Sequence, residues 1–169
     1  MKSKLIIAIA LFGLFTTCFG QQSANWDKWN WIMGEWVGVG TGQPGQGGGY
    51  FTFSTDLSNN ILVRKGHTEF PASENKPNVI HDDLMVVYPD RSGVPLKAIY
   101  FDNEGHTINY LVTYSENSII LTSEKNEGAP LFRLTYTLLD KETVNTKFEM
   151  SQNGVALMTY VEGKSKKTK

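Results

Sequence analysis

Cysteine is nearly absent from this chain. Cys18 is the one cysteine, so a protein that begins after Gly20 has none. Such a protein has no disulfide, no thiol nucleophile and no thiolate metal ligand. Basic residues are also scarce in the body of the chain, because residues 21–163 hold 10 Lys and Arg against 17 Asp and Glu, a net charge of −7. A nucleic-acid surface needs clustered Lys and Arg, so this acidic body argues against one.

Long helical patterns are missing as well. Residues 26–36 place apolar side chains at spacings of three and four, which predicts one or two helical turns. The remainder consists of short segments rich in Val, Ile, Thr, Tyr and Phe, divided by Gly, Asn, Asp and Pro, a pattern typical of strands. The predicted strands are 35–41, 50–55, 61–68, 84–88, 96–101, 107–115, 118–124, 131–138, 144–151 and 156–162.

Several of these strands alternate strictly between apolar and polar residues. In 106–114, His106, Ile108, Tyr110, Val112 and Tyr114 share one face. One dry face per strand is the antiparallel pattern. With hardly any helix to cover a sheet, the dry faces must meet each other, and closing the sheet also removes exposed edges. The sequence therefore predicts one all-β domain, an antiparallel barrel of about ten strands with a short N-terminal helix.

The glycine-rich stretch from Gly34 to Gly49 does not match a phosphate loop. A P-loop has Lys and then Ser or Thr after its last glycine, whereas Tyr50 follows here. In "GEWVGVGTG" the glycines and Trp36 recur at every second position, which puts them on one face of a strand. Glycine on one face lets a strand bend sharply, as the first strand of a small barrel must. The run 45–49 predicts a loop.

The pattern G-x-W-x-G-x-G-x-G from Gly34 to Gly42, with Pro44 beyond it, resembles the first strand of the nitrobindin-like barrels. These belong with lipocalins and fatty-acid-binding proteins to the calycin group. "YFDNEGHTINY" and "FRLTYTLLD" are similar to stretches in exported bacterial proteins of uncharacterised role. The resemblance implies a barrel that holds a small molecule. Nitrobindins bind haem through a histidine near their C-terminal strands, but no histidine follows His106 here, so a haem would need His67, His81 or His106 in a different geometry.

The first twenty residues have the composition of a signal peptide. Lys2 and Lys4 precede an apolar run, and 16–20 are mostly small, which predicts cleavage after Gly20. A lipoprotein anchored to the membrane through Cys18, or a retained N-terminal anchor, is the alternative. Cleavage or lipidation predicts a protein outside the cytoplasm, with a barrel domain at 21–163. Residues 164–169 contain four lysines and no acid, which predicts a frayed, solvated tail.

A barrel of this size can hold one small ligand inside. Such sites are mostly apolar with a few placed polar groups. The candidate ligand-binding residues are therefore aromatic or polar residues on faces that are otherwise dry. They are Trp36, Phe53, Arg64, His67, Tyr100, His106, Tyr110, Arg133, Tyr136 and Tyr160.

Two kinds of candidate have a second interpretation. His106 either lines the pocket with Tyr110 or hydrogen-bonds to Asp102 or Glu104 at a hairpin end. Arg64 and Arg133 can each point inward or outward, and the apolar neighbours of Arg133 favour an outward direction. The tryptophans at 26, 29 and 31 are expected to plug one end of the barrel rather than to cover a ligand.

Catalytic and metal-binding signatures are not evident. His81, Asp82 and Asp83 offer metal ligands together with His67 or His106, but their spacing matches no recognised pattern, so no metal site is predicted. No Gly-x-Ser-x-Gly is present. We expect a protein that binds an apolar or amphipathic molecule. A haem-binding or enzymatic barrel that uses the same cavity, and a ligand-free structural or interaction module of the cell envelope, are the alternatives.

Overall fold

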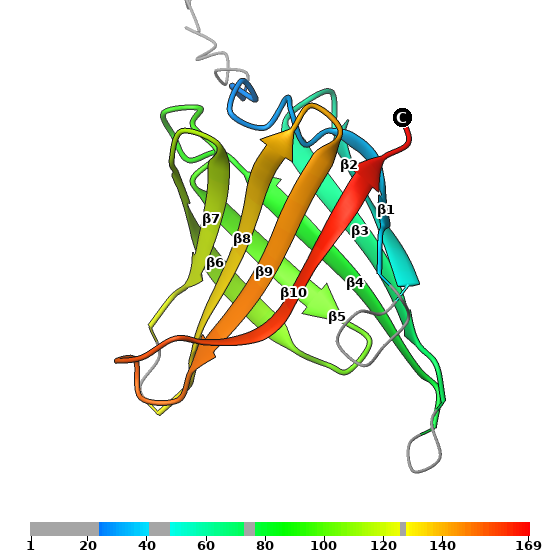
Figure 1. Cartoon of the computed structure of the whole chain (residues 1–169). Helices are drawn as coiled ribbons and strands as arrows, with labels where there is room; N and C mark the ends of the chain where they lie inside the picture. Colours follow the sequence, from blue (N-terminus) through cyan, green and yellow to red (C-terminus); the bar gives the residue numbers. More distant parts are fainter. Residues whose placement is uncertain (1–23, 41–47, 73–76, 126–127) are drawn as a thin grey trace, which may run out of the picture.

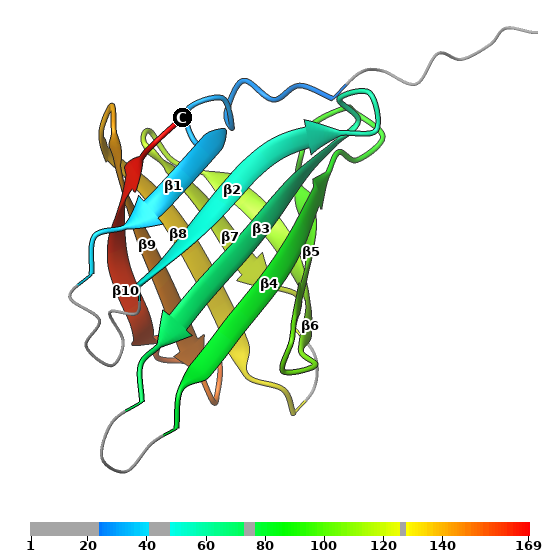
Figure 2. The same cartoon turned by 90° about the vertical axis from the view of Figure 1, so that its right-hand side faces the viewer.

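The computed structural model describes residues 24–40, 48–72, 77–125 and 128–169. Its ten strands are β1 (Gly34–Gly38), β2 (Gly48–Asp56), β3 (Ile61–Phe70), β4 (Val79–Tyr88), β5 (Lys97–Asp102), β6 (Thr107–Tyr114), β7 (Ser118–Ser123), β8 (Leu131–Asp140), β9 (Thr143–Ser151) and β10 (Met158–Lys167). Each strand pairs antiparallel with its chain neighbours, and β10 pairs with β1, which closes the barrel (Figures 1 and 2).

The predicted all-β fold and all ten predicted strands are confirmed. Several strand boundaries differ from the prediction. Gly48 and Gly49, which were expected in a loop, belong to β2, and β10 extends to Lys167. β4 begins at Val79 rather than near residue 84, so His81, Asp82 and Asp83 lie within a strand and not at its entry. The hairpin between β5 and β6 turns at Gly105, which has the positive φ of +90° that the sequence predicts for this glycine.

The segment before β1 covers one end of the barrel, at the top in Figure 1. It forms tight turns over residues 27–32, with hydrogen bonds from Trp29 N to Trp26 O (2.7 Å) and from Ile32 N to Trp29 O (3.0 Å). The structure assigns no helix to the residues it describes. Those residues therefore contain no long apolar helix that could cross a membrane. Trp29 is completely buried and donates from Nε1 to the Tyr114 hydroxyl at 2.8 Å. The expected tryptophan plug is thus present, and we call this end of the barrel the capped end.

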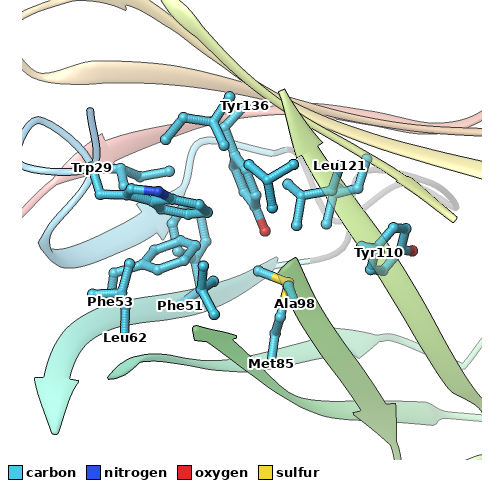
Figure 3. Packing of buried hydrophobic residues seen from close by; sticks show 14 of the residues in the cluster. Trp29, Phe51, Phe53, Leu62, Met85, Ala98, Tyr110, Leu121 and Tyr136 are labelled. Carbon is cyan, nitrogen blue, oxygen red and sulfur yellow. The ribbon is translucent and has the colours of Figure 1, made fainter. Parts of the chain in front are cut away.

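The apolar core fills the interior next to the capped end. Trp36 stacks on Phe51 with ring centroids 6.2 Å apart, and Phe53 meets Tyr136 edge to face at 5.5 Å. Figure 3 shows Trp29, Phe51 and Phe53 on one side of the cluster and Leu121 and Tyr110 on the other. Fully buried aromatic and branched side chains of this kind leave little free space, so this half of the barrel is packed.

Gly34 explains why the first strand needs a glycine. Its φ is +116°, and a Cβ on it would lie 2.1 Å from the carbonyl oxygen of Lys169. Gly38 belongs to the same strand and shares the inward face with Trp36, as predicted. Gly40 lies beyond the end of β1, and Gly42 is outside the described residues.

The lysine-rich end of the chain is part of the barrel, so the prediction of a frayed tail was wrong. Trp36 pairs with Lys167, and Gly38 pairs with Ser165. Beyond the strand, Glu35 N donates to Lys169 O at 3.1 Å. Without these partners β1 and β9 would each leave an unpaired edge. The backbone of this segment supplies the closure, and a sequence pattern that reflects only side-chain charge does not reveal it.

Deletion of residues 165–169 is expected to lower the free energy of unfolding by several kcal/mol, because each lost backbone hydrogen bond of the β1–β10 seam contributes roughly 1 kcal/mol. Urea unfolding followed by circular dichroism measures this. Lys166→Ser, which keeps the backbone and changes an exposed side chain, serves as the control and should unfold like the wild type. A truncated protein with the wild-type urea midpoint would contradict the role given to the seam.

Candidate functional site: a polar layer inside the barrel

The inward faces of β2 to β6 form rows across the barrel wall. One row runs through Phe53, Arg64, Met85, Tyr100 and Ile108, which are directly opposed in the strand pairings. Because side chains alternate between the two faces of a strand, every member of this row points inward. The next row toward the uncapped end contains Gly66, Asp83 and Asp102.

Arg64 and Asp83 form an ion pair inside the barrel. Their side chains are 12% and 6% exposed, and Arg64 Nη1 donates to Asp83 Oδ1. The guanidinium also lies over the Phe51 ring, 5.1 Å from its centroid. A buried charge is tolerated only when it is paired, so each of these residues requires the other.

Gly66 makes room for this pair. A Cβ at this position would lie 2.3 Å from Asp83 Oδ2 and 2.6 Å from Arg64 Nη1. No positive φ requires glycine at residue 66. Space for the ion pair is therefore the reason for a glycine in the middle of β3.

Three tyrosines complete what we call the polar layer, defined as Arg64, Asp83, Tyr100, Tyr110 and Tyr136. Tyr136 is completely buried and Tyr110 is 2% exposed. Burial raises the pKa of Tyr110, Tyr136 and Tyr100. All three phenols therefore stay neutral and offer hydroxyl groups rather than charge.

Three buried polar atoms have no hydrogen-bond partner among the described residues. They are Arg64 Nε, Tyr136 Oη and Thr146 Oγ1. All three residues face the interior, and Figure 3 shows the Tyr136 hydroxyl directed toward the middle of the barrel. Leaving a buried donor unsatisfied costs about 1–3 kcal/mol. A bound molecule that forms hydrogen bonds with these atoms would therefore recover this free energy.

His81 connects the polar layer to the uncapped end. Its Nδ1 lies 3.0 Å from Glu104 Oε1, and its Nε2 lies 2.9 Å from the Tyr100 hydroxyl. His81 shares the inward face of β4 with Asp83. A carboxylate, an imidazole and a phenol are thus joined in series, and the phenol belongs to the polar layer.

The opposite wall is apolar. Phe132 and Phe148 stack with centroids 5.7 Å apart and planes inclined by 13°. Both face inward on β8 and β9 and are only partly buried. A Cβ on the inward-facing Gly163 of β10 would meet nothing within 4 Å. The interior between the polar layer and the uncapped end, which we call the cup, is therefore not filled by side chains at this wall.

Beside β3, β4 and β5 there is a hollow of about 390 Å³. It is lined by Gly66, Asp83 and Asp102 and by Lys65, Asp82, Leu84, Phe101 and Asn103. Because Lys65, Leu84 and Phe101 point outward, the hollow lies on the outer surface of this wall and is separate from the cup.

Six of the ten candidates lie inside the barrel. Trp36 and Phe53 belong to the packed half next to the capped end. Arg64, Tyr100, Tyr110 and Tyr136 come together in the polar layer. The sequence left open whether Arg64 points inward or outward. In the structure it points inward.

Four candidates do not line the interior. His67 lies on the outer face, with Nδ1 2.6 Å from Asp82 Oδ1 and its ring stacked on Tyr50. His106 is bonded to Asp102 at 2.9 Å, with a side chain 62% exposed, which is its hairpin interpretation. Tyr160 is 71% exposed, where the pairing of β9 and β10 shifts in register, and its ring meets that of Phe148 edge to face with centroids 6.2 Å apart. Alternation within β3 turns His67 outward, the hairpin turn before β6 holds His106, and the register shift displaces Tyr160.

Arg133 is the fourth of these, and it takes the outward direction that its neighbours favour. Its Nε donates to Glu149 Oε2 at 2.8 Å, and Lys147 Nζ lies 3.0 Å from Glu149 Oε1. The hydrogen bond from Arg133 holds the pKa of Glu149 below its usual value, against the effect of burial. This cluster belongs to the outer wall.

Sequence reasoning missed Gly66 and Thr146 as parts of the site and considered His81 and Asp83 only as possible metal ligands. Alternation from Arg64 would have placed Gly66 on its face, but the pairing of β3 with β4 is needed to put Asp83 beside it. Within the described ranges, no group of three or more His, Cys, Asp or Glu side chains is arranged to hold a metal ion.

Comparisons with known proteins agree with the fold. The chain matches no family model, and no curated protein matches it. The crystal structure of Rv2717c from M. tuberculosis is similar, with a TM-score of 0.53 and 12% sequence identity over 82% of this chain and 94% of that one. An identity this low supports a shared barrel architecture alone.

Gly66→Ala is expected to destabilise the protein by about 1–3 kcal/mol, because the added methyl group overlaps the Arg64–Asp83 pair. Gly163→Ala adds the same group on another inward face where nothing lies within 4 Å, so it is the matched control and should change stability little. Thermal and urea unfolding measure both variants. Equal stability losses in the two would show that strand propensity, and not the ion pair, requires Gly66.

Proposed function

We propose that the protein binds a small, neutral, amphipathic molecule in the cup, with its apolar part against Phe132 and Phe148 and a hydrogen-bond acceptor against the polar layer. The observation that carries this proposal is the set of unpaired polar atoms inside an otherwise apolar interior. Arg64 Nε can only donate, and Tyr136 Oη has a hydrogen to donate. The two groups lie close together, because the Arg64 side chain lowers the pKa of the Tyr136 phenol against the larger effect of burial. One carbonyl or ether oxygen can therefore accept from both.

Charge argues for a neutral head group. The one cation of the polar layer, Arg64, is already paired with Asp83. Asp102 and Glu104 add negative charge on the same side of the interior. An anionic head would meet these carboxylates in a low-dielectric space, where repulsion is strong. A ketone, an amide or an ester avoids this repulsion and still accepts from Arg64.

Haem does not fit the residues present. Strands β8 to β10 contain no histidine. His67 faces outward, His106 lies in an exposed turn, and the Nε2 of His81 is occupied by Tyr100. None of the three offers a free ring nitrogen to the cup. We therefore keep the calycin type, supported by the Gly-x-Trp first strand and ten-strand closure, without the haem of the nitrobindins.

The fluorescent ketone 6-propionyl-2-(dimethylamino)naphthalene (Prodan) is neutral and aromatic and is a suitable probe. We expect it to bind with one-to-one stoichiometry and a blue-shifted emission. Arg64→Gln and Tyr136→Phe should each weaken binding by roughly ten-fold, because each removes a hydrogen bond worth about 1–2 kcal/mol. Fluorescence titration gives the dissociation constants.

Arg133→Gln is the control for Arg64→Gln, since both arginines pair with a carboxylate but only Arg64 faces the interior. It should bind Prodan like the wild type. The double variant Arg64→Gln/Asp83→Asn avoids an uncompensated buried charge and should bind weakly as well. Saturable binding that none of the interior substitutions alters would place the ligand elsewhere and contradict the proposal.

We also propose that the protein is exported, on the basis of the composition of residues 1–20. Mass spectrometry of the protein from its own host should give a mature chain that begins at Gln21. A mature chain that begins at a lipidated Cys18 supports export by the lipoprotein route instead. A chain that starts at Met1 in the cytoplasmic fraction would contradict export.

A further inference from the structure

The hydrogen bonds that join Glu104, His81 and Tyr100 are all donated in the same direction, from Tyr100 toward Glu104. Ionised Glu104 can only accept hydrogen bonds, so it places the proton of a neutral His81 on Nδ1. His81 Nε2 then carries the lone pair, and the Tyr100 hydroxyl, 2.9 Å away, donates to it. The oxygen of Tyr100 is left with free lone pairs and a path for its own proton toward His81.

The unpaired donors of the polar layer lie close to this oxygen. Arg64 and Tyr100 occupy the same row with Met85 between them. Their backbones are therefore two strand spacings apart, roughly 10 Å, and both long side chains point into the same interior. A small molecule whose acceptor oxygen lies at Arg64 Nε would have its neighbouring atoms within reach of Tyr100.

We propose that Tyr100 is a catalytic proton-transfer group, with His81 and Glu104 behind it, and that the cup interconverts the keto and enol forms of an apolar carbonyl compound or shifts a double bond next to the carbonyl. The inference rests on the proposed binding function and names a reaction and a substrate class for the same cup. The cup supplies three things that this reaction needs. Tyr100 accepts a proton, Arg64 and Tyr136 donate hydrogen bonds to the carbonyl oxygen, and the stacked phenylalanines contact the apolar part.

The step balances without any co-reactant. A C–H bond next to the carbonyl breaks, and its electrons form a C=C bond while the carbonyl oxygen becomes an enolate oxygen. The proton goes to the Tyr100 oxygen as the Tyr100 proton moves to His81 Nε2. Arg64 Nε–H and the Tyr136 hydroxyl stabilise the enolate charge, in the manner of an oxyanion hole. Return of the proton to the same carbon, to another carbon or to the oxygen gives the product.

The relay also explains how Tyr100 acts while remaining a phenol. Burial, with a smaller contribution from Asp102, raises the pKa of Tyr100, so a free tyrosinate would be unfavourable. Because the hydroxyl loses one proton as it gains another, no tyrosinate forms. The positive charge that reaches the His81 ring during the step lies beside the Glu104 carboxylate, with Nδ1 3.0 Å from Oε1. This contact stabilises the charge until the proton returns.

The test uses 2-tetralone, a neutral bicyclic ketone, in D2O. Proton NMR follows the exchange of its C1 protons for deuterium, with the buffer-catalysed rate subtracted. The full mature protein should accelerate exchange, and Tyr100→Phe should lower the rate roughly 100-fold, the size expected for loss of a positioned acid–base group. His81→Gln should lower it as well, and it leaves Tyr100 in place.

Two substitutions are matched controls. His106→Gln removes a histidine that pairs with a carboxylate at a similar distance but contacts no tyrosine in the cup. Tyr50→Phe removes the hydroxyl of an exposed tyrosine on the outer face of β2. Both should keep the wild-type exchange rate. For Glu104→Ala, which removes the acceptor, the imidazole ¹⁵N spectrum should show that His81 loses its fixed Nδ1–H form, a change that a purely structural role of Glu104 would not produce.

Competition with Prodan separates this inference from the binding proposal. If 2-tetralone displaces Prodan but exchange is equal in wild type and Tyr100→Phe, the relay is overturned and the binding function stands. If Prodan binds and 2-tetralone does not displace it, the relay is again overturned, because the relay requires a neutral ketone in the cup. If Prodan itself does not bind, both proposals fail.

Discussion

Closure of the sheet by backbone pairing between β1 and β10 is the constraint on which the rest of the structure depends. Once the tenth strand meets the first, every inward-facing side chain of the ten strands must share one interior. Polar groups that face inward then lose contact with bulk water and must find partners there. The close approach of the last residue to Gly34 shows how tightly this seam fits.

Within that interior, packing and chemistry are divided along the barrel axis. The buried tryptophans and phenylalanines fill the half next to the capped end. The polar layer follows. There the absence of a side chain on Gly66 leaves room for the Arg64–Asp83 ion pair. Beyond this layer the walls are unlike each other, with stacked phenylalanines on one side and an acidic, histidine-containing surface on the other. A ligand with one apolar and one polar end matches this division.

The pairing of the histidines with carboxylates limits which of them can act inside the barrel. Each histidine of the chain contacts a carboxylate, but His81 alone also reaches a phenol that faces the interior. The same pairing that occupies the histidines leaves none free for a haem. Under the proposed function, the interior holds a neutral carbonyl compound in place of a haem.

The strands, their alternation and the hairpin turns were predictable from the sequence, because a period of two and turn glycines are local properties of the chain. The site was less predictable. His67, His106 and Tyr160 were expected inside but lie outside the cup. Alternation within β3, a hairpin turn and a register shift, respectively, decide where these three side chains lie.

The sequence by itself determined a closed all-β barrel with a tryptophan-capped end, since dry faces without helices to cover them must meet each other. The tertiary structure alone decided that the lysine-rich end closes the barrel and that Asp83 lies opposite Gly66 beside Arg64. It also decided that His81 joins Glu104 to Tyr100. These outcomes depend on strand register, which brings together residues that are far apart in the chain and that no local pattern relates.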